Sequence, residues 1–149
     1  MKKYLLVLVS LITVIIILFL TGSSVLTYNF FGIPLGNLIV WLGLISIQLF
    51  FYLLNRGYKN QTNTFTKIIR ILAMFFLVIA CLWFFVAYVI AGNVNFNFSG
   101  SSTEFIGSPT ASILYWNIIY TLIISPIILA FLYKVLNSIK RRNLTHNEK

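Results

Sequence analysis

Charged residues are scarce in this chain of 149 residues, where they make up only 9% of the total, against about 25% in typical soluble domains. Only two residues are acidic, whereas 60% are hydrophobic and 17% are aromatic. The few charges leave uncharged stretches at 4–55, 71–103 and 105–133, each longer than the roughly 20 residues that cross a bilayer. The composition excludes a soluble domain and predicts an integral membrane protein.

A single cysteine, Cys81, and a single histidine, His146, exclude two kinds of chemistry. One thiol cannot form an internal disulfide, which excludes the membrane thiol oxidoreductases, because these enzymes exchange paired cysteines. His146 has only Glu148 beside it in the tail, which is too few ligands for a metal site. We therefore expect no metal and no cofactor, and we interpret Cys81 as a small packing residue.

Ionisable side chains are missing from the interiors of the apolar stretches. Asp, Glu, Lys, Arg or His within a membrane mark proton relays and ion pathways, because such groups are costly to hold in hydrocarbon. Serines such as Ser10 and Ser46 have no His or Lys within a span to act as their base. The chain also has no glycine-rich phosphate loop, so we expect a protein that is not an enzyme.

Polar breaks divide the apolar sequence into four spans. The stretch 4–55 is too long for one span and is interrupted within 21–29, which predicts a helical hairpin. Polar connections follow at 55–66 and 92–112, and a basic tail occupies 137–149. The sequence therefore predicts a single-domain, all-α integral membrane protein with four transmembrane helices. The predicted spans are 4–20, 30–54, 68–91 and 113–136.

Positive charges fall on one side of this topology. The eleven basic residues are Lys2, Lys3, Arg56, Lys59, Lys67, Arg70, Lys134, Lys140, Arg141, Arg142 and Lys149. The opposite connections, 21–29 and 92–112, contain none. Because basic residues mark the cytoplasmic side of a membrane protein, the pattern predicts a multi-pass cell-membrane protein with both termini in the cytoplasm. A three-span alternative would place two basic segments on opposite sides.

The first span has an alternative interpretation as a signal peptide, because Lys2 and Lys3 precede it and Gly22, Ser23 and Ser24 follow it. Its apolar stretch is longer than the usual ~7 to 15 residues, and no A-x-A cleavage site follows. We therefore favour a retained helix.

The formal net charge of +9 is divided among segments beside the bilayer, which favours lipid rather than nucleic acid as the partner. Each Lys or Arg near an anionic leaflet contributes roughly 1 kcal/mol of attraction. We expect contacts with anionic headgroups of the inner leaflet from the cluster that follows the fourth span. This cluster consists of Lys140, Arg141 and Arg142.

Few polar uncharged residues lie within the spans, where interhelical hydrogen bonds contribute roughly 0.6 to 2 kcal/mol each. At 100° per residue Asn37, Trp41 and Gln48 share one face of the second span. The predicted polar seam adds three residues of the fourth span: Asn117, Thr121 and Ser125. In one interpretation four of them, Asn37, Gln48, Asn117 and Thr121, bond to one another in the bundle centre. In the other they form a solute path or a seam for a partner.

Two prolines lie in the predicted spans. Pro126 cannot donate to the carbonyl of Leu122 and should kink the fourth span there. We expect Ser125 or Thr121 to hydrogen-bond the freed carbonyl, as is frequent in membranes. Pro34 falls in the first turn of the second span, where proline is tolerated.

The second outer connection alternates polar and apolar residues over 93–98 and then turns at 99–102, which is typical of a short β-hairpin or interfacial flap. The predicted flap residues are Phe96, Phe98, Glu104 and Phe105. Aromatic residues also gather in the outer halves of the third and fourth spans, among them Trp83, Tyr115, Trp116 and Tyr120. These are expected to anchor to headgroups or, alternatively, to shape a groove on the outer face.

In size, charge and topology the chain resembles small accessory subunits of transport complexes and self-immunity proteins against membrane-active bacteriocins. Its Ile, Asn and Lys content indicates a low-GC bacterium. The resemblance implies a non-enzymatic membrane protein that binds a partner protein, a second copy or a membrane-active ligand within the bilayer. The alternative is a small oligomeric transporter or channel for an uncharged or small solute.

Overall fold

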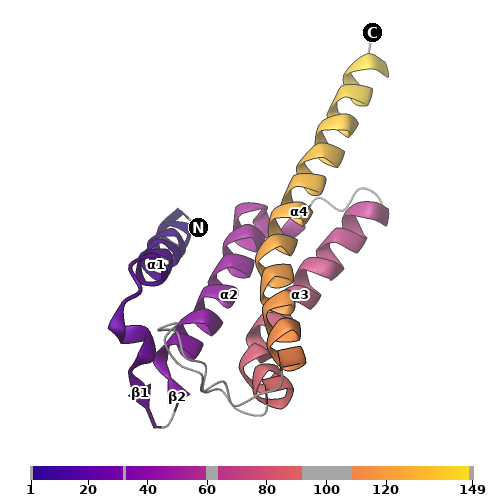
Figure 1. Ribbon diagram of the computed structural model, residues 1–149. Helices are drawn as coiled ribbons and strands as arrows, with labels where there is room; N and C mark the ends of the chain where they lie inside the picture. The colour runs from indigo at the N-terminus through magenta and orange to yellow at the C-terminus, as the bar shows by residue number, and fades with distance from the viewer. Residues whose placement is uncertain (1, 32, 60–63, 92–108, 148–149) are drawn as a thin grey trace.

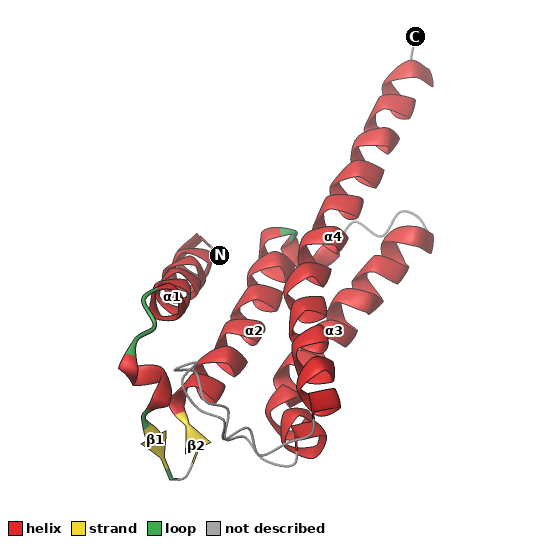
Figure 2. Cartoon of the chain, viewed as in Figure 1, coloured by secondary structure: helices red, strands yellow, loops and turns green. Residues whose placement is uncertain are grey.

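The computed structural model describes residues 2–31, 33–59, 64–91 and 109–147, of which 29, 33, 34, 88–91, 109, 111, 112 and 140–147 are described by their backbone alone. Within these residues the chain forms four long helices, as Figures 1 and 2 show. They are α1 (Lys2–Leu20), α2 (Leu35–Leu54), α3 (Thr64–Ala91) and α4 (Pro109–Asn147). All four are long and apolar enough to cross a membrane. The prediction of an all-α chain with four such helices is confirmed.

Five helix boundaries differ from the predicted spans. α2 begins at Leu35 rather than at 30, because β1 (Asn29–Phe30) and β2 (Ile33–Pro34) form a short antiparallel ladder before it. Pro34 therefore precedes the helix instead of lying in its first turn. α1, α3 and α4 each begin earlier than predicted, and α4 continues through the predicted tail to Asn147. The hairpin predicted at 93–102 lies outside the described residues.

The turn after α1 shows why this apolar helix ends where it does. Gly22 has a φ of +57°, a left-handed conformation that glycine adopts without steric cost. Its amide donates to the Phe19 carbonyl at 3.3 Å, and the Ser23 amide donates to the Leu18 carbonyl at 3.1 Å. This pair of bonds is a Schellman motif, which satisfies carbonyls that the helix end leaves free. A short 3₁₀ helix, η1 (Ser24–Thr27), then buries Leu26.

The helices are arranged as a packed group of three with a fourth beside it. α2, α3 and α4 pack against one another, and α1 lies alongside α2 (Figure 1). No side chain of α1 is buried. α1 is therefore a peripheral helix that depends on a single neighbouring helix.

Small residues on α3 bring the three packed helices close together. Ala73, Ala80 and Ala87 are all buried and recur every seven residues on one face of the helix. In lipid, helices associate through close packing rather than through the hydrophobic effect, and small residues permit that approach. Around Ala80 and Ala87 lies the larger core cluster, whose other buried members are Leu44, Trp83, Tyr115, Ile119 and Leu122.

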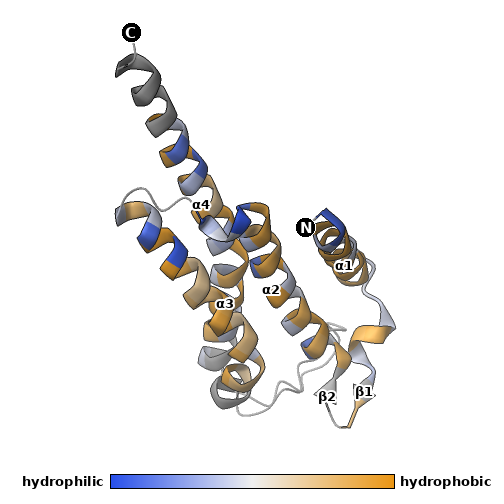
Figure 3. Cartoon of the chain, turned by 180° about the vertical axis from the view of Figure 1, so that it is seen from behind, coloured by the Kyte–Doolittle hydropathy of each residue, from blue (hydrophilic) through white to orange (hydrophobic). Residues whose placement is uncertain are grey.

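One end of the bundle collects the hydrophilic residues. The start of α1, the end of α2 and the start of α3 all lie at this end, from which α4 also projects (Figure 3). The described basic residues belong to these segments, and they are Lys2, Lys3, Arg56, Lys59, Lys67, Arg70 and Lys134. The opposite end carries η1, β1 and β2 (Figure 1). The fold thus brings together basic segments that are far apart in the sequence.

Candidate functional site

The central polar contact of the bundle joins α2 to α4 at Pro126. Gln48 is 3% exposed, and its Nε2 donates to the Leu122 carbonyl at 2.7 Å and to Ser125 Oγ at 3.2 Å. Pro126 has no N–H with which to bond the Leu122 carbonyl, so the Gln48 amide takes the place of the missing helical donor. Ser125 Oγ adds a longer bond of 3.4 Å to the same carbonyl.

The expectation that Ser125 or Thr121 would bond this carbonyl is confirmed for Ser125. Ser125 contributes, but the shorter bond comes from Gln48 on another helix. Thr121 instead donates to the carbonyl of Asn117 in its own helix at 2.8 Å. The pairing of Gln48 with Leu122 could not be predicted from the sequence, because it depends on which face of α4 meets α2.

Trp41 joins α2 to α3 in a similar way. Its Nε1 donates to the Ala80 carbonyl at 3.1 Å and the Cys81 carbonyl at 3.0 Å. The indole ring also lies 5.6 Å from the ring of Phe84. Trp41 and Gln48 therefore hold the three packed helices together through backbone carbonyls.

Asn37 is the exception on this face of α2. The residue is 5% exposed, and neither its Oδ1 nor its Nδ2 has a hydrogen-bond partner among the described residues. A buried amide without partners costs roughly 1 to 3 kcal/mol relative to a satisfied one. Asn37 is therefore a buried polar side chain whose bonding capacity the described part of the fold leaves unused.

The structure does not bring all six predicted seam residues together. Asn117 and Thr121 are exposed on the surface of α4, so they do not meet Asn37 or Gln48 in the bundle centre. The expected hydrogen bonding among these four residues is wrong, because α4 turns its Leu122 and Ser125 side toward α2 instead.

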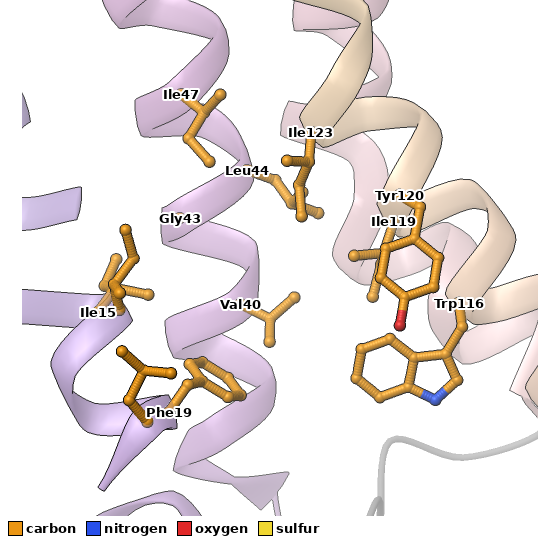
Figure 4. A pocket seen from close by; sticks show the side chains of 12 residues that line it. Ile15, Phe19, Val40, Gly43, Leu44, Ile47, Trp116, Ile119, Tyr120 and Ile123 are labelled. Atoms are coloured by element: carbon orange, nitrogen blue, oxygen red, sulfur yellow. The ribbon is translucent and has the colours of Figure 1, made fainter. Parts of the chain in front are cut away.

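An apolar groove lies between α1, α2 and α4 in the half of the bundle away from the basic end. Its volume is about 270 Å³, and Figure 4 shows its walls. α2 forms the floor, while α1 and α4 form the two walls. The lining residues are Ile15, Ile16, Phe19, Leu20, Val40, Gly43, Leu44, Ile47, Trp116, Ile119, Tyr120 and Ile123.

The groove exists because α1 meets α2 without closing on α4. At Gly43 an added Cβ would lie 3.5 Å from the Ile15 side chain, so α1 and α2 are already in ordinary contact there. On the α4 wall, the rings of Trp116 and Tyr120 stack with their centroids 6.1 Å apart. The rim is open, since Ile16 is 51% exposed and Tyr120 is 56% exposed.

The outer aromatic residues consequently divide into two groups. Trp83 and Tyr115 are buried with their ring centroids 5.3 Å apart, so the expectation that they anchor to headgroups is wrong. Trp116 and Tyr120 line the groove, in agreement with the alternative that outer aromatic residues shape one. The sequence signal for the groove was this aromatic pair alone, because its other lining residues resemble any apolar residue of a span.

A left-handed turn follows α2 at the basic end. Arg56, Gly57 and Tyr58 have φ angles of 52°, 66° and 53°. The turn places Tyr58, 1% exposed, against Tyr133 of α4, with ring centroids 4.9 Å apart. Burial raises the pKa of Tyr58 from 10 to about 12, while a hydrogen bond with the Asn55 side chain lowers it and Tyr133 raises it further.

Positive charge at this end has no acidic counterpart among the described residues, since Glu104 and Glu148 both lie outside them. The side chains of Lys140, Arg141 and Arg142 are not described, although α4 passes through these positions. The predicted flap residues also lie outside the described ranges. They are Phe96, Phe98, Glu104 and Phe105. The headgroup cluster and the flap thus stay predictions.

Four apolar helices of membrane-spanning length indicate a multi-pass membrane protein. In the described part of the chain, no group of three or more His, Cys, Asp or Glu is placed to hold a metal ion. Comparison of the chain with protein-family models, curated proteins and solved structures finds no match. The features of the chain that bear on function are therefore the groove and the polar contacts between the helices.

Proposed function

We propose that the protein is a non-enzymatic, multi-pass membrane protein that acts by binding a hydrophobic partner or membrane-active ligand within the bilayer. The observation that supports this most directly is the open groove between α1, α2 and α4. Concave, mostly apolar sites with a few polar groups at their edges are the usual form of binding sites. The groove has this form and opens toward the surrounding lipid.

Its first wall is suited to recognition. α1 has no buried side chain and packs mainly on α2, so its position relative to α4 depends on few contacts. A helix with so few contacts belongs to the least stable part of a fold, from which binding elements are commonly drawn. A ligand in the groove would connect α1 to α4 and add contacts that the isolated chain lacks.

The polar contacts favour binding over the alternative of a solute path. Gln48, Ser125 and Trp41 all bond to backbone carbonyls of neighbouring helices or of their own, so their polar groups hold the bundle together. Asn37 retains bonding capacity, but its amide atoms are enclosed, so a polar group of a partner would reach them only by displacing the side chains that cover the start of α2. Transport by an oligomer stays a prediction that these contacts do not favour.

We further propose that the basic end faces the cytoplasm, so that both termini are cytoplasmic and the cell membrane is the site of action. Basic segments are retained on that side of a membrane. A single-cysteine test in a Cys81→Ser background checks this orientation. Thr27→Cys, in η1, should react with a membrane-impermeant thiol reagent in intact cells, whereas Lys59→Cys should react only after permeabilisation. The reverse pattern would contradict the orientation.

Binding itself is tested by isolating the tagged protein from its native membrane in mild detergent and measuring its native mass. We expect a stoichiometric companion, protein or small molecule, that is lost in Ile16→Trp because the indole fills the groove. Ile17→Trp is the matched control, since Ile17 is 52% exposed and does not line the groove. A companion that both variants retain, or a chain without any companion, would contradict the proposal.

A further inference from the structure

We propose that the occupant of the groove is one acyl chain of a membrane phospholipid from the leaflet opposite the basic end. This inference rests on the proposed function, because it names the ligand of the same site. Four features of the groove support an acyl chain: its width, its lining, the charge around it and the polar atoms at its edge.

The width of the groove fits a hydrocarbon chain better than a helix. Its floor runs from Val40 to Ile47, a length of about 10 Å along α2. A free volume of about 270 Å³ over this length gives a cross-section of about 26 Å², whereas a helix with side chains, about 10 Å wide, needs about 80 Å². Carbon atoms pack at about 3.5 to 4.0 Å, so an extended chain fits inside the groove, whereas a helix would rest on its rim.

The lining is suited to hydrocarbon along its whole length. The floor and walls consist of branched aliphatic side chains, one glycine and three aromatic rings. The polar side chains of the bundle are held elsewhere, with Gln48 and Ser125 on the α2–α4 contact and Trp41 on α3. A peptide segment in the groove would leave its backbone amides without partners, which costs several kcal/mol per group in hydrocarbon.

Charge around the groove argues against selection of an anionic headgroup. The described basic residues lie at the opposite end of the bundle (Figure 3), and the segments 21–29 and 92–112 contain no Lys or Arg. The groove should therefore recognise the chain and the ester region of a lipid, and should accept zwitterionic and anionic lipids alike.

Two polar atoms lie at the edge of the α4 wall. The Tyr120 hydroxyl points toward the end of the groove at which the Trp116 indole lies (Figure 4). Trp and Tyr are typical of the membrane interface, where their rings contact hydrocarbon and their polar atoms meet the headgroup region. A chain in the groove would place its ester oxygens within reach of these two donors.

Lipid retention by the purified protein tests the inference. The detergent-solubilised full chain is supplied with phosphatidylcholine, and bound lipid per chain is counted by native mass spectrometry. We expect one retained lipid, and a loss of at least about tenfold in the bound fraction for Ile16→Trp and Ile123→Trp, because excluding two or more methylenes from the groove weakens binding by that order. Ile17→Trp and Ile124→Trp, half-exposed positions that do not line the groove, should retain it.

Each alternative has its own outcome. Equal retention by all four variants would mean ordinary boundary lipid and would overturn the inference. A preference of more than about tenfold for phosphatidylglycerol that Ile16→Trp leaves unchanged would also overturn it, since that lipid would lie at the basic end. If native-membrane isolation yields a protein companion that Ile16→Trp removes while lipid retention is unchanged, the acyl-chain assignment fails and the proposed function stands. If neither companion nor lipid responds to groove variants, both fail.

Discussion

Replacement of Gln48 by leucine should destabilise the bundle through one identifiable atom, the carbonyl oxygen of Leu122. The Gln48 amide supplies the 2.7 Å bond that Pro126 withholds from this carbonyl, and Leu122 is 1% exposed. In Gln48→Leu the carbonyl keeps only the 3.4 Å bond from Ser125 Oγ. The substitution therefore leaves a buried acceptor that is poorly satisfied.

The magnitude follows from two contributions. Interhelical hydrogen bonds in membrane bundles average about 0.6 kcal/mol and reach about 1.7 kcal/mol. An acceptor that stays buried without its partner costs roughly 1 to 3 kcal/mol, and Ser125 offsets part of this. We expect Gln48→Leu to lower the free energy of unfolding by about 1 to 2 kcal/mol.

A double-mutant cycle with Pro126→Ala isolates the bond. This substitution restores a backbone N–H for the Leu122 carbonyl, so in that background Gln48→Leu should cost less than about 0.5 kcal/mol. The coupling between the two positions is then at least about 0.5 to 1.5 kcal/mol, against a usual additivity error of about 0.3 to 0.5 kcal/mol. Unfolding in mixed micelles of mild detergent and dodecyl sulfate, followed by tryptophan fluorescence, measures each variant.

The control for this cycle is Ser46→Ala. Ser46 is a buried neighbour whose hydroxyl donates to the Leu42 carbonyl of its own helix. The cost of Ser46→Ala should be small and the same in both backgrounds. An equal cost of Gln48→Leu in the native background and in the Pro126→Ala background would refute the reasoning.

Three further predictions concern other positions. Asn37→Leu should raise the free energy of unfolding by about 1 kcal/mol, because it removes a buried amide without partners, yet lower recovery of a companion; a loss of stability in unfolding titrations would count against this. Gly57→Ala should lower the free energy of unfolding more than Gly22→Ala does. Both glycines have positive φ, which costs a non-glycine residue about 1 to 2 kcal/mol, but at Gly57 the new Cβ also meets the Tyr52 ring at 3.3 Å, while at Gly22 it meets nothing within 4 Å. Equal costs would show that the Tyr52 ring moves aside freely. The contribution of the neutral Tyr58 side chain to the free energy of unfolding should be complete below pH 10 and fall between pH 10 and 12, because its pKa is raised to about 12 in the folded chain. In Tyr58→Phe the melting temperature should therefore change less over this pH range. A pH profile that the substitution leaves unchanged would contradict the role of Tyr58 burial.

The number and approximate position of the helices follow from the sequence because the membrane imposes one length on every span. Charge scarcity and polar breaks were enough to locate α1, α2, α3 and α4 to within a few residues over most of their lengths. The exceptions have local causes. Pairing of β1 with β2 shortens α2 at its start, and the polar sequence after 136 continues as helix because nothing in it breaks one.

The faces by which the helices pack against one another could not be predicted from the sequence. In a soluble helix the polar face shows that the opposite face is the buried one. α1 is apolar all round, so nothing in its sequence distinguishes Ile16, which lines the groove, from Ile17, which does not. The hydrogen-bond partner of Gln48 could not be predicted from the sequence either, because it is a backbone carbonyl freed by a proline on another helix. A shared polar face predicted that Gln48 matters without indicating what it bonds.

The left-handed turn shows a third limit. Asn55-Arg56-Gly57 in a polar connection indicates a turn, but two of the residues with positive φ are not glycine. Their conformational cost is offset by burial of the Tyr58 ring against Tyr133. Only the tertiary structure supplies that compensation.

The central claim, that the groove between α1, α2 and α4 is a binding site in the membrane, is tested most directly by photo-crosslinking in native membranes. A benzophenone amino acid is placed at position 16 in one variant and at position 17 in another, and the adducts are identified by mass spectrometry. Position 16 should give adducts in several-fold higher yield than position 17, and Ile123→Trp, which fills the groove from the α4 wall, should remove this excess. Equal yields from the two positions, or an excess that Ile123→Trp leaves unchanged, would contradict the account.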